Sequence, residues 1–331
     1  MIRPVRSCSL RLVCLVTLLF FVFPALRGSA EDQAQGDANA PVQSNALMFP
    51  KPDPAYFTAP APTTETINAF LKNLWGYDEN RVWQIQAVLK TRAEGVSKVI
   101  VFVGDKTGNN QSGVIELFVM PDGKHLLLAS LGSDIAAFGK DPNSEIRAIL
   151  QKYADGPSLG AKSKDLEIVE LVDYQCPFCK LQHADLKKIL ADFPNAHYVF
   201  QPLPMTLIHA YSAMAAAYGY CVAQAAGNDA FFRYTDAVFE NQSGFDSPVT
   251  GWKTLDDAAS KAGLDPVKVS ACAASPAAKA KIEAWGKLAS DLAIHIPMIS
   301  INGRLLPEGH VPYETLKQII EYQMKLDGIT K

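Results

Sequence analysis

Residues 167–186 read EIVELVDYQCPFCKLQHADL, and in them a run of branched apolar residues leads directly to two cysteines three positions apart. A run of this kind is typical of a strand that is buried on both faces of a sheet. Pro177, between the cysteines, suits the first turn of a helix, where its missing N–H has no partner to lose. The sequence therefore predicts a buried strand that leads into a Cys-Pro-Phe-Cys motif at the start of a helix.

The position of Cys176 at a predicted helix start favours a reactive thiolate. Unpaired backbone N–H groups and the positive end of the helix dipole both stabilise negative charge there, so we expect the pKa of Cys176 to be lowered. Cys179 follows one turn later on the same side of the helix and can resolve a mixed disulfide formed by Cys176. This spacing predicts a nucleophile and a resolving thiol.

The same two cysteines could instead form half of a metal site or a static structural bridge. A zinc site needs two further ligands, and no second CxxC pair or paired histidines follow at zinc spacing. The helix-start position of Cys176 argues against a static bridge. We expect no metal and no cofactor, and keep a copper-handling or zinc-handling protein as an alternative.

The chain after the motif predicts the remaining elements of an α/β domain. Residues 196–204 predict a second strand, and residues 207–293 have an alanine-rich helical pattern. Breaks in this pattern fall around Gly227, Gly244 and Gly263. Residues 294–309 contain two short strands joined by Asn302-Gly303, a dipeptide typical of tight hairpins. A last helix is expected from about residue 312 to residue 326.

This order of elements resembles the thioredoxin-like proteins of the periplasmic DsbA type, over roughly residues 160–331. The resemblance implies a protein dithiol-disulfide oxidoreductase in which the two cysteines react. It also implies that Glu170, six residues before the first cysteine, is the buried acid of the family, and that Pro297, after Ile296, is its cis-proline. A buried carboxylate can take the proton of the resolving thiol, and the backbone beside such a proline can pair with a substrate chain.

Phe178 departs from the DsbA pattern, in which a histidine usually stands at this position and helps to hold the thiolate. Phenylalanine offers the thiolate neither a hydrogen bond nor a charge. The CPFC motif is closer to that of glutaredoxins, whose potentials lie around −200 to −230 mV. We therefore expect Pro177, Phe178 and Ile296 to modulate the centre, and Phe178 to make it a weaker oxidant than DsbA.

Cys221 and Cys272 lie in the helical insertion, where the resemblance implies a second, structural disulfide; two free buried thiols are the alternative. His209 could approach the active site, although a histidine that starts a helix more often packs or caps. Two further expectations concern burial. We expect His183 and His197 to be exposed, and Met205 and Met298 to pack in the core.

Residues 64–155 predict a small α+β domain, in which one helix is followed by four strands of an antiparallel sheet. A second helix over residues 141–154 closes this domain, and residues 156–164 are the expected boundary. In outline the domain resembles the dimerising domains of periplasmic disulfide isomerases. This leaves open a homodimer as well as a substrate-holding or docking role.

The first 30 residues have the pattern of a secretory signal, with arginines, an apolar run and small residues before an expected cleavage after Ala30. An uncleaved membrane anchor is the alternative.

Residues 31–63 are polar and then proline-rich, which predicts a disordered tether. Cleavage leaves 27 basic and 34 acidic residues, a net charge of −7 that implies no surface for nucleic acid. It also leaves four cysteines, an even number typical of exported disulfide proteins.

These features together predict a thiol-disulfide oxidoreductase that is periplasmic or otherwise exported. Its expected partners are folding exported proteins with cysteines, and a membrane redox partner that recharges it. A disulfide isomerase or reductase is the main alternative. The isomerase depends on a homodimer formed through the N-terminal domain.

Overall fold

The computed structural model describes residues 49–106, 113–128, 135–292, 296–306 and 309–330. The expected signal, residues 1–30, and the first part of the expected tether lie outside the described residues.

The last part of the expected tether, residues 49–63, lies against a sheet and does not form a free linker. The backbone N–H groups of Thr58 and Ala59 donate to the carbonyl of Val88 at 2.9 and 3.0 Å. A short 3-10 helix, η1 (Pro54–Tyr56), precedes them. The composition of the segment does not reveal this order, because its hydrogen bonds are made with a strand some 30 residues further along the chain.

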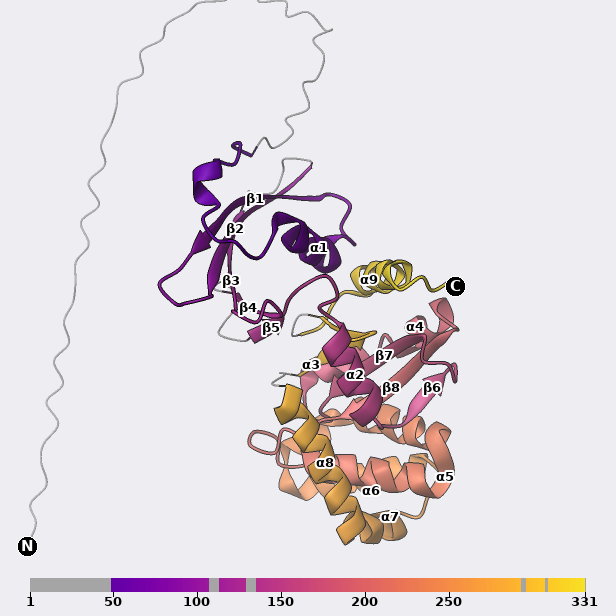
Figure 1. Cartoon of the computed structure of the whole chain (residues 1–331). Helices are drawn as coiled ribbons and strands as arrows, with labels where there is room; N and C mark the ends of the chain where they lie inside the picture. The colour runs from indigo at the N-terminus through magenta and orange to yellow at the C-terminus, as the bar shows by residue number, and fades with distance from the viewer. Residues whose placement is uncertain (1–48, 107–112, 129–134, 293–295, 307–308, 331) are drawn as a thin grey trace, which may run out of the picture. The chain divides into compact units, whose positions relative to one another are not determined.

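The first sheet is antiparallel, and its strands follow the order of the chain (Figure 1). They are β1 (Arg81–Lys90), β2 (Ser97–Asp105), β3 (Gly113–Val119), β4 (His125–Leu128) and β5 (Ile135–Ala137). α1 (Thr64–Trp75) covers one face, where Ile67 and Leu71 pack with Val99 and Val101 of β2. The predicted helix and four strands are confirmed. β5 was not expected, because a three-residue strand is too short for its periodicity to be recognised.

The second sheet is mixed and has the strand order β10-β9-β7-β8-β6. Its strands are β6 (Ser158–Gly160), β7 (Leu166–Val172), β8 (Ala196–Pro202), β9 (Met298–Ile301) and β10 (Arg304–Leu305). β7 is parallel to β8 and antiparallel to β9, and each of its residues is buried. The prediction of a strand buried on both faces is therefore confirmed. This strand carries the Cys-Pro-Phe-Cys motif at its end.

The predicted hairpin joins β9 to β10. Asn302 and Gly303 both have left-handed backbone conformations, with φ of 49° and 85°, which asparagine and glycine tolerate best. The Asn302 side chain also accepts the backbone N–H of Glu167 at 2.7 Å and donates to the carbonyl of Asp165 at 2.8 Å. The turn is thereby fixed to the beginning of β7.

Helices cover both faces of the second sheet. α2 (Ser144–Tyr153) and α8 (Pro276–Leu292) pack on the face of Val169 and Leu171. The other face, with Ile168 and Val172, is covered by α3 (Pro177–His183), α4 (Leu186–Asp192), α5 (Ser212–Glu240) and α9 (Tyr313–Leu326). α2 thus differs from the expectation that it closes the first domain, because its buried Leu150 packs in the core of the second sheet.

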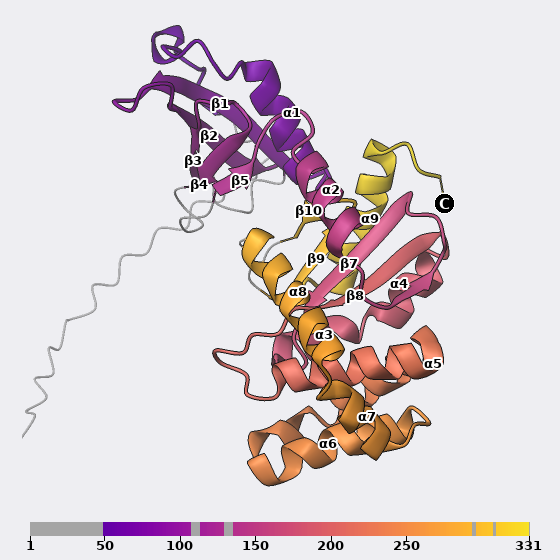
Figure 2. The same cartoon turned by 60° about the horizontal axis from the view of Figure 1, so that its bottom comes forward.

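The helical insertion is confirmed, and it groups α5, α6 (Pro248–Lys261) and α7 (Pro266–Ala273) beside the second sheet (Figure 2). The predicted breaks are present. Gly227 interrupts α5 with φ of 77°, Gly244 lies in the 3-10 helix η2 (Gln242–Asp246), and Gly263 has φ of 90°. Cys221 of α5 and Cys272 of α7 are joined by a disulfide, with 6.0 Å between their Cα atoms. Among the described helices, none is long and apolar enough to cross a membrane.

Candidate active site

Cys176 stands at the N-cap of α3, directly after the loop that follows β7, and Cys179 lies one turn further on. Both are free thiols, with exposed fractions of 7% for Cys176 and 0% for Cys179. The side-chain amide of Gln242 donates to the carbonyls of Tyr174 and Cys176, at 2.9 Å each, and so holds the loop. The loop is therefore held in place, and both thiols are buried, with a small exposed fraction left to Cys176 alone of the two.

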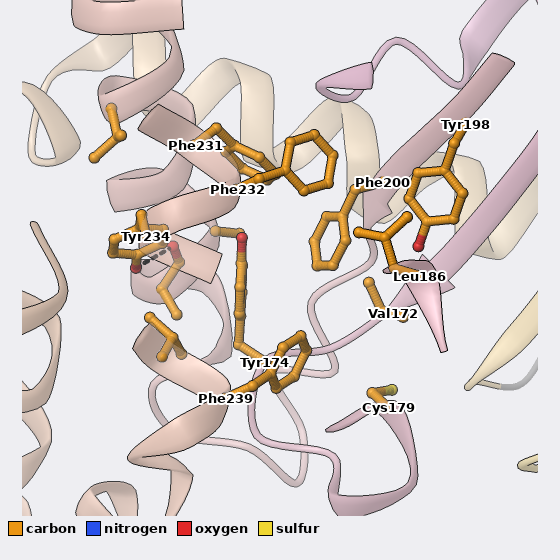
Figure 3. Close-up of a cluster of buried hydrophobic side chains, with 14 of the residues drawn as sticks. Val172, Tyr174, Cys179, Leu186, Tyr198, Phe200, Phe231, Phe232, Tyr234 and Phe239 are labelled. Atoms are coloured by element: carbon orange, nitrogen blue, oxygen red, sulfur yellow. Dashed lines mark hydrogen bonds between the residues drawn. The ribbon is translucent and has the colours of Figure 1, made fainter. Parts of the chain in front are cut away.

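Aromatic side chains close the inner side of this motif. Figure 3 shows Cys179 at the edge of a buried cluster with rings from β8 and α5. Tyr174, two residues before the first cysteine, packs against Phe200 and Phe239, with ring centroids 5.5 and 5.6 Å apart. Its hydroxyl lies 3.0 Å from that of Thr235. The cluster keeps the Cys179 side chain away from solvent.

The two thiols have pKa values shifted in opposite directions. A hydrogen bond from the Cys179 thiol, with support from the backbone N–H groups of Cys179 and Phe178, lowers the pKa of Cys176 to about 6, although partial burial and the charge of Asp173 oppose the shift. Burial is the main cause that raises the pKa of Cys179, followed by its hydrogen bond with Cys176 and by the charge of that thiolate. Near neutral pH Cys176 is therefore the thiol that ionises more readily, and Cys179 keeps its proton.

Glu170 lies on β7, on the same face of the sheet as the aromatic cluster, with an exposed fraction of 1%. Its Oε2 atom accepts a short hydrogen bond from the hydroxyl of Tyr198 and lies 3.3 Å from Nδ1 of His183. Its Oε1 atom has no hydrogen-bond partner in the described structure. The charge of Glu170 also contributes to the raised pKa of Cys179.

Pro297 is buried, and its peptide bond with Ile296 is cis. Gln182 of α3 donates its side-chain amide to the carbonyl of Met298 at 3.4 Å, which brings the segment around this proline beside the Cys-Pro-Phe-Cys helix.

Phe178 has an exposed fraction of 56% and offers an apolar surface beside Cys176. The methionine prediction is confirmed, since Met205 and Met298 both pack against the core around β7.

The expected exposure of two histidines is wrong. His183 is buried, because α3 turns it inward between Phe200 and Phe239, at centroid distances of 5.5 and 5.1 Å. His197 is half-buried on β8, with Nδ1 2.7 Å from the carbonyl of Ala161. The helical periodicity of the sequence does not reveal the burial of His183, because Phe200 and Phe239 come from distant segments of the chain.

Asp173 is a buried residue of the site that sequence reasoning missed. It accepts the backbone N–H groups of Gln175 and Met205, at 2.7 Å each, and the hydroxyl of Ser212. His209 does approach the motif, with Nδ1 3.0 Å from Asp173 Oδ1, although the pair lacks hydrogen-bond geometry. The signal in the sequence that could have identified Asp173 is an acid at the end of a buried strand.

Among the described residues, no group of three or more His, Cys, Asp or Glu side chains is arranged to hold a metal ion.

Comparison with known proteins gives one family match and several partial likenesses. The family model described as Thioredoxin matches residues 152–322, slightly more than half of the chain. Among curated proteins, the Na(+)/H(+) antiporter NhaA 1 of Salinispora arenicola is 33% identical over 84 residues, and NhaA 3 of Salinispora tropica is 30% identical over 83. Each alignment covers 25% of this chain and 12% of the antiporter, so the chain matches only a small part of these relatives.

Solved structures with partial likeness include a periplasmic thioredoxin-like protein from Salmonella enterica serovar Typhimurium, at 24% identity and a TM-score of 0.46, covering 55% of this chain and 97% of that one. BdbD from Bacillus subtilis is 23% identical, also with a TM-score of 0.46, and the alignment covers 51% of this chain and 93% of BdbD.

Proposed function

The chain belongs to the thioredoxin family, and from this premise we propose that it is a thiol-disulfide oxidoreductase that oxidises the thiols of other proteins through Cys176 and Cys179. The observation that carries the proposal is the opposite shift of the two thiol pKa values within one turn of helix. Exchange needs one sulfur that attacks and leaves readily as a thiolate, and a second that stays protonated until it is needed.

The reaction runs through a mixed disulfide. A substrate thiolate attacks the Sγ atom of Cys176 in the oxidised enzyme, the bond between Cys176 and Cys179 breaks, and Cys179 takes up a proton. A second substrate thiolate then attacks the mixed disulfide and releases Cys176 as a thiolate. Two electrons pass from the substrate to the enzyme, and the substrate leaves with a new disulfide.

The lowered pKa of Cys176 favours the direction in which the substrate is oxidised. A depressed pKa stabilises the reduced enzyme as the pH rises above about 6, and this contribution is lost as the pH falls through that value. At pH 7 the lowered pKa favours the reduced form roughly tenfold, which corresponds to a reduction potential higher by about 30 mV. The phenyl side chain of Phe178 adds no further stabilisation of the thiolate, so we expect an oxidant weaker than DsbA.

The compartment and the partners follow from the same chemistry. The signal-like N-terminus and the bridge between Cys221 and Cys272 support an exported, periplasmic protein, because such bridges persist in oxidising compartments. Its substrates are then folding exported proteins with cysteines. A membrane redox partner must take two electrons from the reduced enzyme after each cycle.

Refolding of a reduced, multi-cysteine substrate tests the proposal. The oxidised full-length protein should form substrate disulfides stoichiometrically, faster than glutathione disulfide at equal concentration. Its own Cys176 and Cys179 should become reduced at the same rate, as measured by thiol alkylation and mass spectrometry. A protein that leaves the reduced substrate unchanged, yet efficiently rearranges one with scrambled disulfides, is instead an isomerase.

A further inference from the structure

His183 lies between two carboxylates. Its Nδ1 atom is 3.3 Å from Oε2 of Glu170, and its Nε2 atom is 3.0 Å from Oδ1 of Asp236 on α5. Exposure increases along this row, from 1% for Glu170 and 6% for His183 to 41% for the Asp236 side chain. The three groups therefore connect the buried acid of the active site to the protein surface.

A cavity of about 290 Å³ borders the outer end of this row, and His183 and Asp236 both contribute to its lining. The other ionisable groups that line it are Lys187 of α4 and Asp229 and Arg233 of α5. Lys187 Nζ lies 3.9 Å from Asp236 Oδ2. On the inner side, Glu170 faces His183 directly. Tyr198 lies behind it and donates a hydrogen bond to the Glu170 carboxylate.

A buried carboxylate needs a nearby positive charge if it is to stay ionised. The hydroxyl of Tyr198 donates to Glu170 but is neutral, and the described ion pair of Glu170 is with His183. Burial alone would lower the pKa of His183, but its hydrogen bonds to Asp236 and Glu170 outweigh burial and raise the pKa to about 9. At neutral pH His183 is therefore positively charged beside Glu170.

We propose that His183, held between Asp236 and Glu170, is a positioning residue whose positive charge lies beside Glu170 and orients that carboxylate to accept the proton of Cys179. The inference rests on the proposed function and concerns the half-reaction in which the reduced Cys179 displaces a partner from Cys176. The proton of Cys179 passes to Glu170, and the new thiolate attacks the Cys176 sulfur. The bond between Cys176 and Cys179 forms, the bond to the partner breaks, and the partner leaves as a thiolate with the electron pair.

Reaction of the reduced protein with an aromatic disulfide, 5,5′-dithiobis(2-nitrobenzoate), separates the two steps in one absorbance trace. Attack by Cys176 releases one coloured thiolate, and attack by Cys179 on the mixed disulfide releases a second. His183→Asn should slow the second phase by at least about tenfold at pH 7. A general base such as Glu170 contributes ~10²-fold or more, and the variant removes the residue that positions it. The first phase should be unchanged, because His183 is not among the groups that shift the pKa of Cys176.

Three further variants separate a charge effect from a general disturbance. Asp236→Asn should slow the second phase by a smaller factor, and because Asp236 is partly exposed this variant also serves if His183→Asn does not fold. Glu170→Gln should slow the same phase, and adding His183→Asn to it should cost little more. His197→Asn, a matched change of a histidine outside the row, should leave both phases as they are.

The pH dependence of the second phase is the decisive readout. In His183→Asn the rate should rise again as the pH is raised, because hydroxide in solution can then take the proton of Cys179 in place of Glu170. A second phase that is unchanged in both His183→Asn and Asp236→Asn would overturn the inference. If the parent protein released no coloured thiolate at all, the proposed function itself would fail.

Discussion

Replacing Cys176 by serine should abolish thiol-disulfide exchange, while replacing Cys179 by serine should leave a protein that reacts once and then stops. The reason is the division of roles between the thiols: of the two, only Cys176 has a lowered pKa and keeps a small exposed fraction. Without Cys179 the mixed disulfide on Cys176 has no internal thiol to resolve it. Mass spectrometry after incubation with a model disulfide should find the adduct on the Cys179→Ser protein alone.

Serine keeps the size and polarity of cysteine, so the fold should persist in both variants, and circular dichroism provides the control. An adduct that accumulates on Cys179 in the Cys176→Ser protein, at a rate close to that of the parent, would reverse the assignment of the two roles.

The disulfide between Cys221 and Cys272 should have the largest effect on stability. It joins α5 to α7 across a sequence separation of 51 residues, and the buried Cys221 lies in the core of the helical insertion. For a loop of this length the chain-entropy model gives roughly 4 kcal/mol of stabilisation. The double variant Cys221→Ala, Cys272→Ala should therefore lose about that much free energy of unfolding.

Urea unfolding of the parent and the double variant, both with Cys176 and Cys179 reduced, measures this difference. The first phase of thiolate release by Cys176 should be the same in the two proteins, because neither alanine touches the motif. A loss below about 1 kcal/mol would mean that the bridge contributes little beyond what side-chain packing already provides.

The chemistry-bearing motif could be predicted from sequence because its determinants are local. A strand of apolar residues, two cysteines one helical turn apart and an Asn-Gly turn each carry their signal within a few residues, and β7, α3 and the hairpin of β9 and β10 are present where expected. The family resemblance added Glu170, which is indeed buried. The role of each site residue stays a prediction until it is tested.

What the sequence did not reveal depends on contacts between distant segments. His183 meets Asp236, 53 residues away, and Asp173 accepts a hydroxyl from Ser212, 39 residues away. α2 packs on the second sheet, although it follows the first sheet in the chain. Pairings of this kind follow from the tertiary fold, and neither periodicity nor local composition carries them.

The reduction potential of the Cys176 and Cys179 pair tests the central claim most directly. Equilibration of the full-length protein with glutathione buffers at pH 7, followed by alkylation and mass spectrometry of the two cysteines, gives this potential. The stabilised thiolate of Cys176 predicts an oxidising pair, and a phenyl side chain at position 178 that donates no hydrogen bond predicts a weaker one than DsbA, so we expect a value between about −120 and −200 mV. A value below about −250 mV would contradict the account, because the pair would then favour its own disulfide, as thioredoxin does.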